Sequence, residues 1–384
     1  MKTSSRTCGL LATAAALSLA LAARPAAAAV TFAVTNLVSD GSVPAVTIDP
    51  DLVNPWGVGL APTSPFWVSD NKTGVATLYN GAGSKIPLTV TIPPSPSSPT
   101  GQVFNSGGAN AFQIAGTKPA FIFDSEDGVI SGWAGSFGTT AQTAVTSSNG
   151  AVFKGLAIGS NATGDHLYAA DFHNGVVDMY TNNFSSFTTF TDPNVAAGYA
   201  PFNAQVLNGQ LYVTFAKQDA AAHDDVAGPG NGYVDVFNLD GTLNRRLVSQ
   251  GGEINSPWGL AIAPDSFHEH SGDLLVGNFG DGTISTFDNL TGAFKGKLLG
   301  LDGNPLVFGD LWALTPGNGV TGSTQQIYFT AGLSEESHGL FGVLTAIPEP
   351  SSWVLMIAGF GLMGAALRAQ RSTGAMWFAR RGRA

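Results

Sequence analysis

The stretch Asn54–Gly81, "NPWGVGLAPTSPFWVSDNKTGVATLYNG", decides the fold, because a close copy of it, "SPWGLAIAPDSFHEHSGDLLVGNFGDGTISTFDNLTG", follows at Ser256–Gly292. Weaker copies begin at Ala109, Phe153, Phe202 and Leu311. A small residue marks each copy, about 50 residues after the last: Gly57, Ala111, Gly155, Ala204, Gly259 and Ala313. Each copy alternates turn residues with short aromatic or β-branched runs, which are typical of strands. Four-stranded units at this period are propeller blades, so we predict an all-β, six-bladed β-propeller over residues 30–346.

The sixth copy has only three strands before Pro348. The segment "TFAVTNLV" from Thr31 precedes the first inner strand and is free to supply the missing one. Pairing of the first and last segments would remove two open sheet edges. We therefore predict that the N-terminal strand closes the last blade.

Three tryptophans, Trp56, Trp258 and Trp312, directly precede a marker residue of the inner strands. Gly or Ala at the marker positions allows the strands to crowd around the axis. The indoles have two interpretations. They pack between blades with the N–H bonded to a backbone carbonyl, or they stack against a sugar at the channel mouth.

The overall charge excludes one class of partner. The formal net charge is −10, and much of the basic charge lies near the two ends of the chain, so the body is more acidic still. Such a surface repels nucleic acid. The single cysteine, Cys8, lies in the N-terminal segment and leaves the body without thiol or disulfide chemistry.

The N-terminus is typical of a signal peptide over residues 1–29. Lys2 and Arg6 precede the apolar run Leu10–Ala23, and Ala26-x-Ala28 suits cleavage.

The C-terminal tail, 347–384, combines a Pro-Glu-Pro motif (Pro348, Glu349, Pro350), an uncharged run at 351–367 and an Arg-rich end. At ~1.5 Å per residue the run reaches the short end of a transmembrane helix, and the positive-inside rule places the arginines in the cytoplasm. An ordinary C-terminal anchor or a buried helix is the alternative.

The segment "IPEPSSWVLMIAGFGLMGAALRAQR" (Ile347–Arg371) resembles the PEP-CTERM sorting signal of Gram-negative bacteria. The resemblance implies export across the inner membrane, transient anchoring, processing by exosortase, and release to the cell surface or extracellular matrix. The extra "STGAMWFARRGRA" departs from the usual short end.

The body resembles a family of exported bacterial proteins that often carry this same tail, through "NLVSDGSVPAVTIDPDLVNPWGVGLAPTSPFWVSDNKTGVATLYNG" (Asn36–Gly81) and onward to the sixth copy. The resemblance implies a propeller akin to the NHL-repeat type. It transfers no catalytic residues.

Acidic residues and histidines gather in the loops expected on one face, the top. Together with the three tryptophans, the candidate binding residues are Asp70, Asp171, His173, His223, Asp224, Asp225 and Asp281. The long loop Lys217–Gly232 carries His223, Asp224 and Asp225, which suit a divalent cation or an acid/base pair. Ordinary turn chemistry at a solvated loop tip is the alternative.

We therefore expect an exported, exosortase-sorted binding or matrix-interaction module, with exopolysaccharide or other surface proteins as partners. The alternative is a metal-dependent hydrolase or lactonase at the top-face funnel. An enzyme needs a converged metal or nucleophile at the channel mouth, and the sequence leaves that question open.

Overall fold

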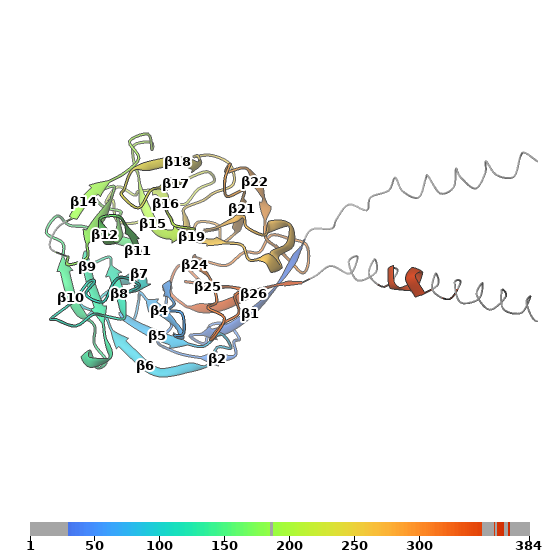
Figure 1. Ribbon diagram of the computed structural model, residues 1–384, viewed down its shortest axis with the longest axis horizontal. Helices are drawn as coiled ribbons and strands as arrows, with labels where there is room; N and C mark the ends of the chain where they lie inside the picture. Colours follow the sequence, from blue (N-terminus) through green and yellow to red (C-terminus); the bar gives the residue numbers. More distant parts are fainter. Residues whose placement is uncertain (1–29, 185–186, 348–356, 358, 365–367, 369–384) are drawn as a thin grey trace, which may run out of the picture. The chain divides into compact units, whose positions relative to one another are not determined.

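The computed structural model describes residues 30–184, 187–347, 357, 359–364 and 368. Residues Thr31–Ile347 form one compact unit of six β-sheets. In Figure 1 the sheets follow one another around a ring in chain order, with the first strand of each blade nearest the centre. The predicted six-bladed β-propeller is confirmed.

Each of the first three blades is a four-stranded antiparallel sheet. Blade 1 contains β3 (Pro55–Gly59), β4 (Phe66–Asp70), β5 (Val75–Tyr79) and β6 (Lys85–Thr91). Blade 2 contains β7 (Pro99–Phe104), β8 (Phe121–Ser125), β9 (Val129–Trp133) and β10 (Gln142–Thr146), with the 3-10 turn η1 (Gly135–Phe137). Blade 3 contains β11 (Phe153–Asn161), β12 (Gly164–Asp171), β13 (Val176–Thr181) and β14 (Phe187–Phe190).

The last three blades repeat this plan. Blade 4 contains β15 (Tyr199–Leu207), β16 (Gln210–Lys217), β17 (Tyr233–Phe237) and β18 (Leu243–Val248). Blade 5 contains β19 (Pro257–Ile262), β20 (Leu274–Asn278), β21 (Ile284–Phe287) and β22 (Phe294–Lys297), with the 3-10 turn η2 (Asp265–His270). Blade 6 contains β24 (Leu311–Pro316), β25 (Ile327–Ala331), β26 (Leu340–Ile347) and β1 (Thr31–Ser39).

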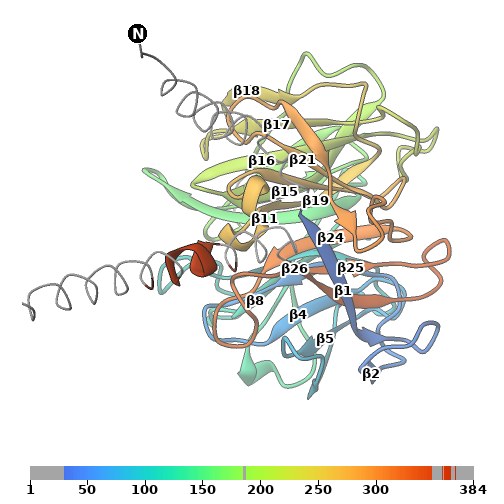
Figure 2. The same cartoon turned by 90° about the vertical axis from the view of Figure 1, so that its right-hand side faces the viewer.

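The N-terminal strand β1 is the outer strand of the last blade. It pairs antiparallel with β26 from Thr31 opposite Ile347 to Ser39 opposite Leu340, and the two lie side by side in Figures 1 and 2. Two short strands, β2 (Thr47–Ile48) and β23 (Leu299–Gly300), add to β1 in parallel. The predicted closure is confirmed, and it ties the start of the propeller to its end.

The apolar core lies between blades rather than within them. For example, Phe66 and Tyr79 of blade 1 pack with Tyr328 and Phe341 of blade 6. Similar clusters join blades 1 and 2, blades 2 and 3, blades 3 and 4, and blades 4 and 5. Because each sheet buries its faces against its neighbours, no blade is a stable unit alone.

The predicted inner strand of the second blade is wrong. Ala111 lies in the loop between β7 and β8, and the inner strand is "PTGQVF", with Gly101 at the marker position. An insertion of turn residues between these two strands displaced the apparent repeat. In the fourth blade the marker position belongs to Asn203, one residue before the predicted Ala204, because Asn203 is the residue that meets the marker Gly155 of blade 3.

The marker glycines allow neighbouring inner strands to touch. A Cβ atom would lie 2.5 Å from Thr100 O at Gly57, and 2.3 Å from Leu156 N at Gly101. At Gly155 it would lie 2.2 Å from Asn203 Oδ1. No side chain fits such gaps, so these positions set how closely the blades pack at the axis.

The predicted signal peptide (1–29) and most of the predicted transmembrane run (351–367) lie outside the described residues, as do Pro348, Glu349 and Pro350. Residues 357, 359–364 and 368 are helical. In the part of the chain that the structure describes, no helix is long and apolar enough to cross a membrane.

Candidate functional site

Two cavities lie on the propeller axis, one toward each face. We call the face at which the inner strands begin the top face, and the face at which they end the bottom face. Trp56, near the start of β3, lines the upper cavity, whereas Leu60, just beyond the end of β3, lines the lower one.

An aromatic cluster separates the two cavities. The rings of Trp56 and Trp312 stack with centroids 3.5 Å apart, and the ring of Trp258 meets both edge-on. Phe172 and Phe202 complete the cluster. Trp258 lines the lower cavity while Trp56 and Trp312 line the upper one, so the axis is blocked rather than open.

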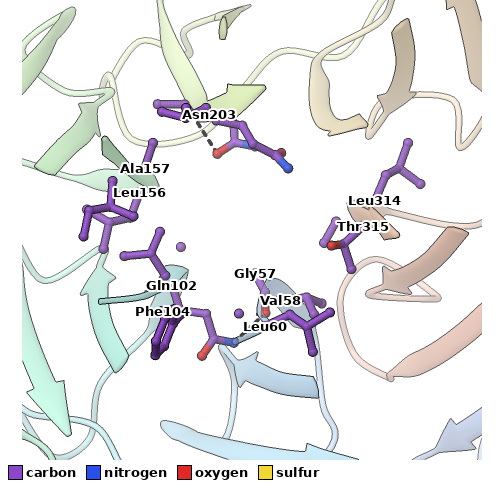
Figure 3. A pocket seen from close by; sticks show the side chains of 18 of the residues that line it. Gly57, Val58, Leu60, Gln102, Phe104, Leu156, Ala157, Asn203, Leu314 and Thr315 are labelled. Carbon is purple, nitrogen blue, oxygen red and sulfur yellow. Dashed lines mark hydrogen bonds between the residues drawn. The ribbon is translucent and has the colours of Figure 1, made fainter. Parts of the chain in front are cut away.

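The lower cavity, of about 290 Å³, is built from the inner strands themselves. Figure 3 shows Leu156, Asn203 and Leu314 around its rim. Two side-chain amides of its lining bond to backbone carbonyls of neighbouring strands. Gln102 Nε2 donates to Gly57 O and Trp67 O, and Asn203 Nδ2 donates to Trp258 O. The lower cavity therefore offers backbone and apolar groups with little ionisable chemistry.

The upper cavity, of about 410 Å³, concentrates the ionisable chemistry of the axis. Its lining comes from loops of five blades and from the inner strands below them: Trp56, Asn71, Lys72, Glu126, Lys154, His223, Asp224, Asp225, Phe279, Asp310, Trp312, Glu335 and Glu336. A volume of this size suits a small organic group or one unit of a longer chain.

The ammonium of Lys154 forms the floor of the upper cavity. It is ion-paired with Glu126 and lies 3.1 Å from Asp224 Oδ1, and its side chain is 2% exposed. Nζ also lies 5.2 Å from the ring centroid of Trp56, a cation–π contact. His223 Nδ1 approaches the same Asp224 oxygen at 3.0 Å.

These contacts keep Lys154 charged. Burial alone would lower the pKa of Lys154, but the negative charges of Glu126 and Asp224 outweigh it and raise the pKa above its usual value. Although burial opposes it, Lys154 holds the pKa of Asp224 below the usual range. On the opposite wall, burial and the nearby charge of Glu126 raise the pKa of Glu336 to about 7.

A left-handed turn carries Glu335 and Glu336 to the cavity. The backbone φ angles of Leu333, Ser334, Glu335 and Glu336 are 38°, 51°, 57° and 62°. Four consecutive non-glycine residues in this region are costly, at ~1–2 kcal/mol each. Hydrogen bonds hold the turn: Glu336 N donates to Asp310 Oδ2, and Asn54 Nδ2 donates to Glu336 Oε2.

Half of the predicted binding residues line the upper cavity: Trp56, His223, Asp224, Asp225 and Trp312. The others lie elsewhere. Asp70 is fully buried and accepts a hydrogen bond from the Thr77 hydroxyl. Asp171 accepts hydrogen bonds from the backbone N–H and the side-chain amide of Asn174 in a turn. Trp258 donates its N–H to Lys154 O.

The remaining two sit away from the axis lining. His173 Nδ1 lies 3.3 Å from Ala222 O, and Asp281 accepts from Thr283 in a turn.

Several lining residues were not predicted from the sequence, among them Lys154, Lys72 and Asp310. A signal for Lys154 existed. It stands immediately before Gly155, the position that Trp56 holds before Gly57 and Trp258 before Gly259. Alignment of the repeats therefore shows a lysine at an inner-strand position where other blades carry tryptophan.

With this geometry established, comparison with known proteins gives the family. The chain is 33% identical over 339 residues to the uncharacterized protein L690 of Acanthamoeba polyphaga mimivirus, covering 83% of this chain and 87% of that protein. It is 32% identical over 335 residues to the uncharacterized protein R648 of the same virus, covering 83% and 81%. The chain belongs to their family. These names state no activity for the family.

Solved structures with a similar course of the chain include streptogramin B lyase, with a TM-score of 0.49, 11% identity, and coverage of 82% of this chain and 98% of that one. Virginiamycin B lyase from Staphylococcus aureus has a TM-score of 0.47, 11% identity, and coverage of 82% and 100%. Likeness of this extent carries no conclusion about activity.

Residues 346–372 match the PEP-CTERM protein-sorting motif. The predicted resemblance of the tail is confirmed. The chain is an exported propeller protein with a sorting signal at its C-terminus.

Proposed function

We propose that the protein is a cell-surface binding module that holds a unit of extracellular polysaccharide in the upper cavity. The observation that carries this proposal is the cavity itself. Its floor is a buried lysine and stacked indoles, and its walls are carboxylates and one partly exposed phenylalanine, Phe279. Carboxylates accept hydrogen bonds from sugar hydroxyls, and an aromatic wall covers the apolar face of a sugar ring.

The long loop Lys217–Gly232 supports a role at the surface. It connects β16 to β17 on the top face, and it brings Asp224 to Lys154 of the neighbouring blade 3. Ile347, the last residue of the propeller unit, ends β26 at the bottom face. The propeller unit therefore ends at the face opposite the one that carries the upper cavity.

A glycan array tests this function. The full chain, purified in mild detergent, is expected to bind a subset of the saccharides. Lys72→Trp fills the rim of the upper cavity from an exposed position and is expected to weaken binding at least tenfold. Lys217→Trp makes the same change at an exposed position of the top face outside the lining, and is expected to bind as the parent does. Absence of binding to every glycan, or equal binding by both variants, would contradict the proposal.

Processing by exosortase is the second part of the proposal and rests on the sorting motif. Glu349→Ala or Pro350→Ala is expected to leave a longer, membrane-bound precursor, as is loss of the host exosortase. Pro65→Ala, in a surface turn of the propeller, serves as the control. Mass spectrometry of the fractionated cells distinguishes the forms, and identical mass and location of all variants would argue against processing at this motif.

A metal-dependent hydrolase is the second candidate, because the ligand atoms of Glu126, His223 and Asp224 lie within 4.8 Å of one another. The surroundings do not fit an ion. Lys154 Nζ contacts two of the three residues, Glu126 and Asp224, and supplies the positive charge that an ion would bring. A divalent cation would have to displace a buried ammonium, so we derive no reaction step through a metal.

A further inference from the structure

Six asparagines of the propeller directly precede a glycine: Asn80, Asn149, Asn174, Asn208, Asn231 and Asn318. In such a pair the backbone nitrogen of the glycine is able to attack the side-chain carbonyl carbon of the asparagine, because glycine has no side chain to obstruct the approach. The attack requires that the glycine N–H first loses its proton. The hydrogen bonding of each glycine N–H therefore decides which asparagine is able to react.

Four of the six glycine N–H groups are bonded to backbone carbonyls. Gly81 N donates to Thr321 O, Gly175 N to Asp171 O, Gly232 N to Gly230 O and Gly319 N to Gly322 O. Among the described residues, Gly150 N and Gly209 N have no acceptor. Both of these glycines are exposed, and nothing lies within 4 Å of their Cβ positions, so there is room for a ring to close. Asn149 and Asn208 remain as candidates.

The backbone distinguishes the two candidates. Asn208 and Gly209 form the two-residue turn between β15 and β16, where Leu207 pairs with Gln210. The φ angle of Asn208 is 50°, as such a turn requires. The paired strands resist the backbone rotation that ring closure needs. Asn149 lies in the loop between β10 and β11, outside the left-handed region, and is free of that restraint.

A neighbouring hydroxyl acts on the side chain of Asn149. Ser147 Oγ accepts hydrogen bonds from Asn149 N and Ala151 N, each at 3.3 Å. With both acceptor positions used, it donates its single proton to Asn149 Oδ1. That oxygen gains negative charge when the carbonyl carbon is attacked, so the hydroxyl stabilises the developing oxyanion. Of the six described pairs, only that of Asn149 combines an unbonded glycine N–H with a donor to Oδ1.

We propose that Asn149 is a site of self-modification, at which the Ser147 hydroxyl promotes deamidation. Hydroxide takes the proton of Gly150 N, and the nitrogen forms a bond to Asn149 Cγ. The bond from Cγ to Nδ2 then breaks, and ammonia leaves with a proton from water. A second water opens the resulting succinimide ring at either carbonyl, which leaves aspartate or isoaspartate. The inference does not depend on what the upper cavity binds.

The modification changes the top face of the propeller. The loop that carries Asn149 joins the outer strand of blade 2 to β11, the inner strand of blade 3. Either product adds a negative charge there, and isoaspartate also lengthens the backbone by one methylene. Lys154, on the floor of the upper cavity, lies in β11. The modified residue therefore lies on the face that carries the upper cavity.

Peptide mapping tests the inference. The full chain in mild detergent is incubated in mildly alkaline buffer made with heavy-oxygen water, and mass spectrometry follows incorporation of the heavy oxygen at each asparagine. We expect Asn149 to convert at least fivefold faster than Asn208 and than the four asparagines whose glycine N–H is bonded. The rate at Asn149 is expected to rise with pH, because hydroxide removes the Gly150 proton.

Three variants examine the role of the hydroxyl. Ser147→Ala is expected to slow conversion of Asn149 about fivefold and to leave Asn208, the internal reference, unchanged. Ser147→Thr retains a hydroxyl and is expected to keep the rate of the parent. Ser148→Ala is the matched control at the adjacent exposed position and is expected to convert as the parent does. Thermal melting verifies that each variant is folded.

The contrary outcomes are equally defined. Conversion of Asn149 no faster than that of Asn208 overturns the assignment of the site. An unchanged rate in Ser147→Ala overturns the role of the hydroxyl. A faster rate in that variant overturns it as well, because it would show that the hydrogen bond restrains the asparagine instead of activating it.

Discussion

Lys154 Nζ lies 3.1 Å from Asp224 Oδ1, across 70 residues of sequence. The same ammonium is ion-paired with Glu126, so one side chain joins the inner strand of blade 3 to loops of blades 2 and 4. This ion-paired junction sits at the axis, on the floor of the cavity where the proposed ligand would bind. Under the proposed function, stability and recognition would share one residue.

Replacing Lys154 with methionine is expected to lower the free energy of unfolding by about 3–5 kcal/mol, because it leaves Glu126 and Asp224 as unpaired charges around a buried site. Urea denaturation of the purified protein measures the change. Lys217→Met, at an exposed position, is expected to cost less than about 0.5 kcal/mol. A loss below about 1 kcal/mol for Lys154→Met would mean that the ion pair is solvated and does not hold the blades.

The close approach at Gly101 gives a second prediction. A Cβ at this position would lie 2.3 Å from Leu156 N, and backbone cannot move aside as a flexible side chain can. Gly101→Ala is expected to lower the free energy of unfolding by about 2 kcal/mol or more. Gly135→Ala is the control, since nothing lies within 4 Å of its Cβ position. Equal denaturation midpoints for the two variants would refute the tight packing of the inner strands.

A third prediction concerns the left-handed turn at Leu333–Glu336. Ser334, with φ of 51°, is exposed. Glycine relieves ~1–2 kcal/mol of backbone strain at such a position and loses up to ~1 kcal/mol through greater freedom of the unfolded chain. Ser334→Gly is thus expected to raise the melting temperature slightly. Ser337→Gly, outside the left-handed segment, is expected to lower it. The opposite order in calorimetry would show that the turn carries no strain.

The buried aspartates predict the pH dependence of stability. Burial raises the pKa of Asp124, Asp178 and Asp235 to about 7, from 3.8 in the unfolded chain. A raised folded-state pKa gives stability that is present below pH 3.8 and is lost progressively as the pH rises to about 7. Asp40 and Asp165 have lowered pKa values, so their contribution to stability changes with pH only below this window.

The melting temperature is therefore expected to fall between pH 5 and pH 8. Asp124→Asn should reduce the slope of that fall, because the amide does not titrate. Asp240→Asn, at a fully exposed carboxyl, should retain the slope of the parent. A melting temperature that rises from pH 5 to pH 8 would show that the pKa values of these aspartates are not raised in the folded protein.

The six-bladed architecture could be predicted from the sequence because each blade repeats the same local pattern of strand and turn residues. The marker Gly57 and the marker Gly259 lie in near-identical strings, and each string carries the turn residues that end its strands. The closure by β1 followed from counting strands in the last copy. The inner strand of the second blade was predicted wrongly, because the loop after Gly101 contains its own small residue, Ala111, in a segment that resembles the start of a strand.

The candidate site was only half predictable. His223 and Asp224 stood out because the loop that carries them is long. Lys154 did not stand out, because its chemistry arises where blades converge. The pKa of Glu336 depends on Glu126, far away in the chain, and no local pattern records that proximity.

The central claim is that the ammonium of Lys154, and not a metal ion, occupies the floor of the upper cavity. A crystal structure of the protein grown with millimolar Mn²⁺ or Zn²⁺, with anomalous diffraction recorded at the metal edge, tests this directly. The account predicts no anomalous peak among Glu126, His223 and Asp224, and electron density for the Lys154 ammonium between the two carboxylates. A metal peak at that position, with Lys154 turned away, would contradict it.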